Sequence, residues 1–127
     1  MGSLLTDGYK TFHVNGLHDK ITKVYGNFTN RHDKLSNLPI NRLGGVVFMG
    51  LQYYIKKYLT AEWDDEFFNV PRHIAIMHIE DTMRAYLGSD YDAGHFEQLH
   101  ELGYLPIKIK ALPEGSVVPY GVAPLTI

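Results

Sequence analysis

The sequence contains no cysteine, and this absence excludes disulfide bonds and metal sites built on thiolates. It also fits a reducing compartment, so we expect a cytoplasmic protein. No apolar run is long enough to span a membrane, because the longest, GGVVFMGLQYYI, is broken by Gln52 and followed by two lysines. The net charge of −2 does not indicate the basic surface with which proteins bind nucleic acid. We therefore expect neither a membrane nor a nucleic acid as a partner.

Several motifs of catalysis and cofactor binding are missing as well. The sequence has no glycine-rich dinucleotide motif, no phosphate-binding P-loop and no G-x-S-x-G nucleophile motif. Its seven histidines raise the question of a metal site. Three histidine pairs are each five residues apart, a spacing that does not place two ligands on one helix face: His13/His18, His73/His78 and His95/His100. We therefore predict solvated or capping histidines and no metal site.

The composition is that of a globular protein. With 127 residues, 45% of them hydrophobic and 20% charged, the chain has enough apolar surface for one core, and we predict a single domain over residues 1–127. In its first half, ITKVYGNFT predicts a strand over residues 21–29. A polar, asparagine-rich loop is expected over residues 30–45. VVFMGLQYYIKKYL has apolar residues at helical spacing, which predicts a helix over residues 46–59.

Two further helices are expected before the chain returns to strands. The second helix should begin near Asn69 as its N-cap, with Pro71 in the first turn, and end at Gly88. Its buried face is predicted to consist of Ile76, Ile79, Met83, Tyr86 and Leu87. A third helix should span about residues 92–102 and end at Gly103.

Near the carboxyl terminus the hydrophobic period changes from helix to strand. Apolar residues alternate with lysines over residues 107–111, LPEG forms a turn, a return strand begins at Val117, and VAPLTI is another strand. This order predicts an α+β fold, a largely antiparallel sheet with about three helices packed on it. We expect the sheet to be incomplete, because the apolar strand that ends at Ile127 has no evident cover. The chain is then either part of a longer polypeptide or pairs with another chain.

The first residues concentrate chemistry that a chain terminus does not usually carry. LLTDGYKTFH holds Asp7, Tyr9, Lys10 and His13 within seven positions, and Arg31 follows the first predicted strand. A phenol ring offers a flat face, and a guanidinium forms paired hydrogen bonds with phosphate oxygens. These groups suit a flat heterocycle and a phosphate. Composition alone leaves open a plainer interpretation, in which the segment only packs on the surface.

Four segments resemble nicotinamide phosphoribosyltransferases, in the order in which that family carries them. They are LLTDGYKTFH, TKVYGNFTNR, VVFMGLQYYIKKYL and LPIKIKALPEGSVVPYG. The resemblance runs from residue 4 to about residue 127 and is loosest over residues 60–103. It covers only the amino-terminal part of such an enzyme.

The resemblance implies transfer of phosphoribosyl from phosphoribosyl diphosphate, with Mg²⁺, to nicotinamide, which gives nicotinamide mononucleotide and diphosphate in NAD salvage. Family members are homodimers whose catalytic histidine and aspartate lie on a barrel that has no counterpart here. The resemblance therefore assigns no catalytic residue and no bound cofactor to this chain, which we expect to be inactive alone. It implies that Tyr9 stacks on nicotinamide across the subunit interface and that Arg31 reaches the phosphate region, while Asp7 adds a favourable field. The alternative is a stand-alone, non-catalytic interaction or regulatory module.

Overall fold

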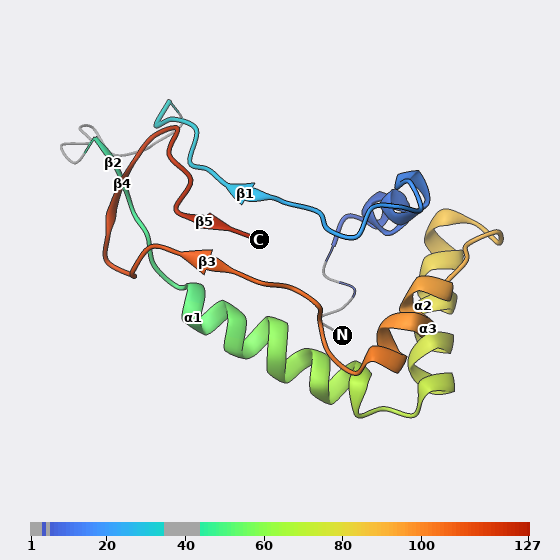
Figure 1. Ribbon diagram of the computed structural model, residues 1–127. Coiled ribbons are helices and arrows are strands. Elements are labelled where there is room, and N and C mark those ends of the chain that lie inside the picture. The colour runs from blue at the N-terminus through green and yellow to red at the C-terminus, as the bar shows by residue number, and fades with distance from the viewer. Residues whose placement is uncertain (1–3, 5, 35–43) are drawn as a thin grey trace. The chain divides into compact units, whose positions relative to one another are not determined.

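The computed structural model describes residue 4 and residues 6–34 and 44–127 (Figure 1). The chain divides into two compact units. The helical unit comprises Met1–Ile21 and Gln52–Pro106, and the strand unit comprises Thr22–Leu51 and Ile107–Ile127. Much of the polar loop predicted before residue 46 lies outside the described residues, since these omit residues 35–43.

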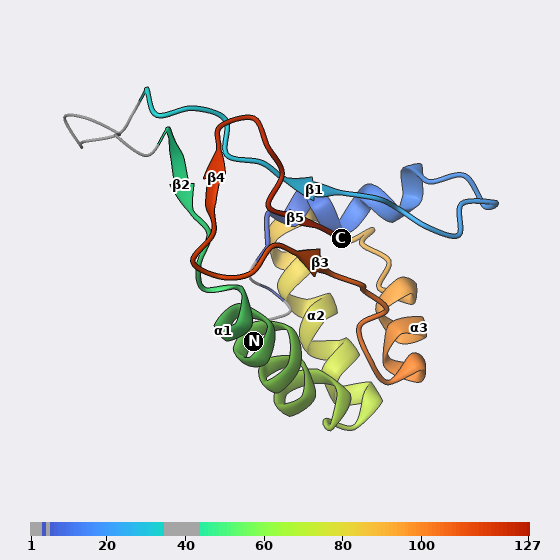
Figure 2. The ribbon, with the colours of Figure 1, turned by 60° about the vertical axis from the view of Figure 1, so that its left-hand side comes forward.

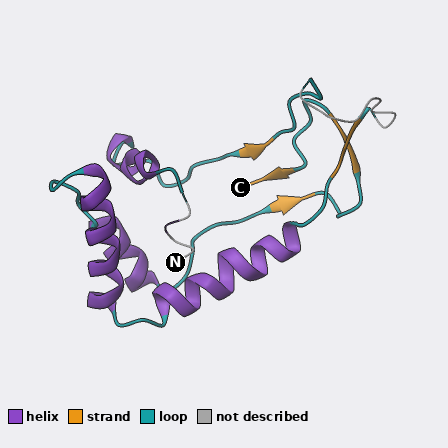
Figure 3. Cartoon of the chain, turned by 180° about the vertical axis from the view of Figure 1, so that it is seen from behind, coloured by secondary structure: helices purple, strands orange, loops and turns teal. Residues whose placement is uncertain are grey.

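Helices provide most of the ordered structure of the helical unit (Figure 3). In chain order they are the 3₁₀ helix η2 (Gly8–Gly16), the helix α1 (Leu51–Tyr54) with its π-helical continuations η3 (Ile55–Ala61) and η4 (Asp64–Phe68), and the helices α2 (Arg72–Leu87) and α3 (Gly94–Leu102).

The first long helix begins later than its sequence pattern predicts. The prediction was residues 46–59, but the helix begins at Leu51 and helical structure continues to Phe68. Val46 and Val47 pair in a strand instead, and Gly50, with φ of 93°, separates that strand from the helix. β-branched valines favour the strand, and a positive φ is unstrained only for glycine.

The two remaining helices end where their glycines predict. Gly88 (φ 110°) follows α2 and Gly103 (φ 76°) follows α3, and both have the positive φ that glycine adopts easily. The prediction of Asn69 as the N-cap of α2 is wrong, because Pro71 holds that position. The backbone of Asn69 instead closes η4 by donating to carbonyls of that helix. The helix α3 begins slightly later than predicted.

The core of the helical unit forms along α2. Ile76, Ile79 and Met83 are buried, as their helical spacing predicts. They pack with other buried side chains from neighbouring segments: Phe67, Ala75, Tyr91, Ala93 and Phe96. The prediction that Tyr86 is buried is wrong, since its side chain is 64% exposed. Tyr86 lies in the last turn of α2, beyond the core, where its ring lies against η2.

The strand unit is built from short antiparallel pairs (Figure 2). Its described strands are β1 (Asn27–Phe28), β2 (Gly45–Val47), β3 (Lys110–Ala111), β4 (Val117–Pro119) and β5 (Leu125–Thr126). One sheet has the order β1-β5-β3, and the other pairs β2 with β4. In the registers, Asn27 and Lys110 both lie opposite Thr126, and Val46 lies opposite Val118.

The strands are shorter than predicted and pair differently. Of the strand predicted over residues 21–29, only β1 is regular, and residues 107–111 are reduced to β3. The turn predicted at LPEG is present, with the Ser116 N–H bonded to the Pro113 carbonyl. The return strand β4 nevertheless pairs with β2 rather than with β3, because Gly115 and Ser116 bond to the backbone of Phe48.

The last strand is not the uncovered edge that the sequence predicts. β5 lies between β1 and β3, and Pro124 directly before it is fully buried. The predicted α+β class is confirmed, as is a largely antiparallel pairing with sheets that do not close. In the part of the chain that the structure describes, no helix combines the length and the apolar character needed to cross a membrane.

Candidate functional site

The amino-terminal cluster lies on η2, which has a buried side and an exposed side. Gly8 and Thr11 are the buried residues of this helix, and they share one side because a 3₁₀ helix repeats every three residues. Tyr9 is 59% exposed, and Asp7, just before the helix, is exposed as well. The Tyr9 ring is therefore accessible in this chain.

Ring contacts at Gly8 and Phe12 hold η2, and one hydrogen bond closes a turn within it. Gly8 lies so close to the ring of Tyr86 that an added Cβ would be 1.8 Å from Tyr86 Cε1. The Thr11 hydroxyl donates a 2.7 Å hydrogen bond to the Gly8 carbonyl. The rings of Phe12 and Tyr91 meet edge to face, with 5.5 Å between their centroids. Tyr86 therefore holds the buried side of η2, whereas Tyr91 contacts Phe12, which is 39% exposed and lies one 3₁₀ turn after Tyr9.

Tyr91 contacts η2 through its ring rather than through its hydroxyl. The side chain is buried, and its hydroxyl oxygen has no hydrogen-bond partner among the described residues. Burial raises the pKa of the Tyr91 phenol, the nearby Thr11 hydroxyl opposes this rise, and the Asp92 charge adds to it. The Thr11 hydroxyl donates its hydrogen bond to the Gly8 carbonyl. The Tyr91 hydroxyl therefore has no hydrogen-bond partner among the described residues. It stays neutral, and its attachment to η2 is apolar.

The exposed side of η2 brings together the other residues of the cluster. Lys10 Nζ lies 3.3 Å from Asp7 Oδ2, and both side chains are largely exposed, so this ion pair contributes little to stability. The rings of Tyr9 and His13 are 5.6 Å apart and inclined by 60°. An edge contact of this kind leaves a face of the phenol ring open to a flat ligand.

Arg31 lies in the strand unit, just after β1. The preceding residue, Asn30, accepts a 2.8 Å hydrogen bond from the Gly121 N–H, which ties this segment to the turn before β5. Arg31 is exposed and forms no ion pair with any described residue. An exposed guanidinium is a group that suits phosphate binding. Asp7 and Tyr9 belong to the helical unit, so the structure brings these two together and places Arg31 in the other unit.

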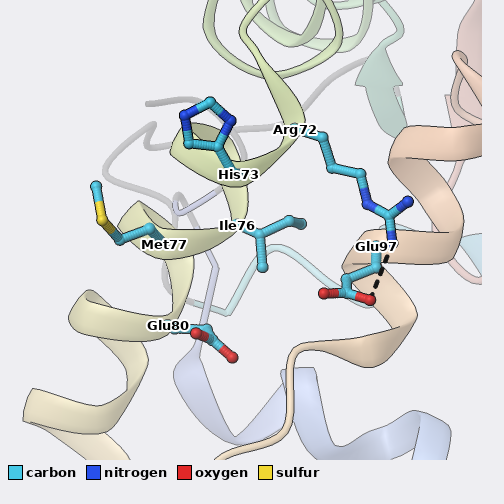
Figure 4. A pocket seen from close by; sticks show the side chains of 6 residues that line it. All are labelled: Arg72, His73, Ile76, Met77, Glu80 and Glu97. Atoms are coloured by element: carbon cyan, nitrogen blue, oxygen red, sulfur yellow. Dashed lines mark hydrogen bonds and ion pairs between the residues drawn. The ribbon is translucent and has the colours of Figure 1, made fainter.

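A shallow pocket that the sequence did not predict lies between α2 and α3. It encloses about 410 Å³ and is lined by Arg72, His73, Ile76, Met77, Glu80 and Glu97 (Figure 4). Arg72 is bound to Glu97 at 3.1 Å and also to Glu101, so its charge is already neutralised and is not free for an anion. No sequence signal predicts the pocket, because Arg72 and Glu97 are brought together only by the packing of α2 on α3. We assign it a structural role.

Two of the histidines are partly buried in the helical unit. Burial lowers the pKa of His95, and the nearby Asp92 charge opposes that shift. His100 donates from Nε2 to the Val70 carbonyl at 2.9 Å and contacts the ring of Phe67. Among the described residues, no three histidine, aspartate or glutamate side chains gather into a group that could hold a metal ion. The histidines of α3 thus stabilise the fold.

A curated relative supports the resemblance that the sequence motifs indicate. No family model matches the chain. The chain is similar to nicotinamide phosphoribosyltransferase of Acinetobacter baylyi, with 40% identity over 122 residues, which are 95% of this chain and 24% of that protein. It thus spans about a quarter of the length of the curated relative that it matches. The resemblance to nicotinamide phosphoribosyltransferases that its motifs indicate is therefore confirmed over nearly the whole chain.

Proposed function

We propose that residues 1–127 form the amino-terminal domain of an enzyme that transfers phosphoribosyl from phosphoribosyl diphosphate to nicotinamide. The products are nicotinamide mononucleotide and diphosphate, and the place of action is NAD salvage in the cytoplasm. The observation that carries this proposal is the 40% identity over 95% of the chain. The catalytic groups belong to other parts of the enzyme, which acts as a homodimer and takes phosphoribosyl diphosphate together with Mg²⁺.

Within that enzyme, η2 acts as a lid that one subunit lends to the active site of the other, with Tyr9 stacked on the nicotinamide ring. The support for this role is that Tyr9 is exposed although its helix is held by ring contacts at Gly8 and Phe12. The ring nitrogen of nicotinamide becomes quaternary during the transfer, so the ring becomes cationic. A tyrosine face attracts such a cation by about 0.5–2 kcal/mol, more when water is excluded. This attraction grows toward the transition state and therefore favours the reaction.

Asp7 and Arg31 act on the two charged parts of the reaction, the cationic nicotinamide ring and the phosphate groups. The Asp7 carboxylate lies just before Tyr9 in sequence, and its negative field favours the cationic ring. Lys10, 3.3 Å from this carboxylate, offsets part of the field, so we expect Tyr9 to contribute more than Asp7. The exposed guanidinium of Arg31 binds the phosphate or the departing diphosphate.

The function is tested with purified protein, by following nicotinamide mononucleotide formation from nicotinamide and phosphoribosyl diphosphate. An enzyme that carries this sequence as its amino-terminal part should form the product, whereas the 127-residue chain alone should not. The control is the same preparation from host cells without the gene, which reveals contaminating host enzyme. Product formation by the 127-residue chain itself would contradict the proposal.

The role of Arg31 has its own test. In the complete enzyme, Arg31→Ala should raise the KM for phosphoribosyl diphosphate by about ten- to a hundredfold, since a charged hydrogen bond contributes about 1.5–3 kcal/mol. The KM for nicotinamide should change little. Arg31→Lys keeps the charge but loses the paired hydrogen-bond geometry. Its KM for phosphoribosyl diphosphate should lie between those of the original enzyme and Arg31→Ala. An effect confined to nicotinamide would show that Arg31 does not act on the phosphate.

A second candidate function is a non-catalytic interaction module. The observation in its favour is the exposure of large apolar side chains in the strand unit, such as Tyr25 (75%) and Met49 (77%). Surfaces of this kind are typical of segments that contact another protein. Failure of every longer protein that carries this sequence to form nicotinamide mononucleotide would favour this module over the enzyme.

A further inference from the structure

We propose that Tyr86 and Tyr91 are positioning residues, which hold η2 at Gly8 and at Phe12, before and after Tyr9, and thereby fix the exposed orientation of Tyr9 for stacking. This inference rests on the proposed function, in which Tyr9 stacks on the nicotinamide ring. Among the described residues neither tyrosine forms a ring contact with Tyr9, and on this account neither touches the substrate. They act through Gly8 and Phe12, the residues of η2 that they contact.

The segment needs such support because it has little of its own. It is a 3₁₀ helix, whose hydrogen bonds are poorer than those of an α-helix, and only Gly8 and Thr11 are buried within it. An η2 that moved freely would have to be ordered each time Tyr9 met its ligand, and that ordering would weaken binding. Contacts that order η2 beforehand remove this loss.

Tyr86 lies where it can hold η2. It has no other evident role among the described residues of the helical unit. Its side chain is 64% exposed and lies outside the core of buried residues along α2. Its ring nevertheless lies directly against Gly8, where the absence of a side chain permits the close approach. Gly8 has no positive φ, so the backbone does not require a glycine there. The close ring contact is therefore the structural reason for a glycine beside Tyr9.

Tyr91 holds the next turn of η2. Its ring contacts Phe12 edge to face, an arrangement that stabilises an aromatic pair by about 0.5–1.5 kcal/mol. Its hydroxyl has no partner among the described residues, so the ring alone provides the contact. The two rings thus hold positions on both sides of Tyr9 in sequence, at Gly8 and at Phe12.

The first test measures amide hydrogen exchange of residues 8–16 in the 127-residue chain. Tyr86→Ala and Phe12→Ala should each speed exchange of this segment by about three- to tenfold, while the amides of Ile76 and Ile79 exchange unchanged. Tyr86→Phe and Tyr91→Phe keep the rings and should match the original chain. Unchanged exchange in both alanine variants would overturn the proposal, and so would equal acceleration throughout the helical unit. This test does not depend on any enzymatic function.

The second test is a double-mutant cycle between Tyr86 and Tyr9 in the complete enzyme, with KM and kcat for nicotinamide as readouts. Tyr86→Ala should raise the KM by about three- to tenfold with a smaller effect on kcat, and should have no further effect in the Tyr9→Ala background. Tyr86→Phe should restore the original KM. Effects that simply add would overturn the positioning role while leaving the stacking role of Tyr9 intact. If Tyr9→Ala alone changes nothing, the stacking role itself is wrong, and the cycle thus separates the two failures.

Discussion

The helical unit and the strand unit are stabilised by different means. The helical unit has a contiguous cluster of buried side chains along α2, including Phe67 and Ile79, which are wholly inaccessible to solvent. In the strand unit the described buried side chains are few, chiefly Phe48, Val118 and Pro124. Its conformation depends instead on backbone hydrogen bonds and turns, such as the Gly26 and Ile127 pair, which exchange bonds at 2.9 and 3.0 Å. Side-chain packing therefore determines one unit, and backbone pairing the other.

This difference predicts which substitutions each unit tolerates. A buried side chain in a close-packed core has many neighbours, so its loss leaves a cavity. A short strand with exposed side chains loses little when one of them is shortened, but it fails when the backbone cannot approach its partner. The two units should therefore respond to opposite kinds of substitution.

The largest effect is expected for Ile79→Ala in the helical unit. Ile79 is fully buried on α2, and truncation of such a residue costs about 2–5 kcal/mol of unfolding free energy. The measurement is urea unfolding followed by circular dichroism of the helices. Val47→Ala, at a half-exposed position of β2, is the control and should cost less than about 1 kcal/mol. Equal losses for the two variants would contradict the difference between the units.

The next effect is expected for Gly45→Ala in the strand unit. A Cβ at Gly45 would lie 2.1 Å from the Val118 carbonyl oxygen, and this obstacle is backbone that cannot swing aside. We expect a loss of about 1–3 kcal/mol, seen as faster hydrogen exchange in β2 and β4. Exchange along α2 should not change. Gly26→Ala has open space around its Cβ and is the matched control.

A smaller effect is expected from acidification, and it should be confined to the helical unit. Because burial lowers the pKa of His95 in the folded chain, the unfolded chain takes up the proton first as the pH falls below about 6.5. The contribution of neutral His95 to stability is therefore complete above that pH and is lost as the pH falls toward the lower folded pKa. His95→Gln should flatten the fall of the melting temperature between pH 7 and about pH 5. His73→Gln, at an exposed position of α2, should leave it unchanged.

The sequence predicted the parts of the fold that depend on local signals. Gly88 and Gly103 end their helices because a positive φ at that point is a property of the residue itself. The core positions of α2 follow from helical spacing in the same way. The pairing of β4 with β2 was not predicted, because turn and strand patterns do not specify a partner some seventy residues away along the chain. Tyr86 was misjudged for a related reason, since only the fold brings η2 against the last turn of α2.

The candidate site also combines features that follow from the local sequence with features that depend on long-range packing. The sequence places Asp7, Tyr9 and His13 within seven positions, but it did not predict the helix η2, which sets the contact between the rings of Tyr9 and His13. The rings that hold η2 come from α2 and from the segment after it, so no sequence pattern near Tyr9 points to them. The residue types near Tyr9 can indicate the chemistry of a ligand. The side chains that hold η2 in place depend on long-range packing.

The central claim is that the face of the Tyr9 ring, not its hydroxyl, acts on nicotinamide. The direct measurement compares kcat/KM for nicotinamide in Tyr9→Ala and Tyr9→Phe variants of the complete enzyme. The account predicts a loss of about ten- to a hundredfold for alanine, which removes stacking worth about 1–3 kcal/mol, and a loss of less than about threefold for phenylalanine. Equal losses in the two variants would contradict the stacking role, and an unchanged kcat/KM in the alanine variant would show that Tyr9 takes no part in the reaction.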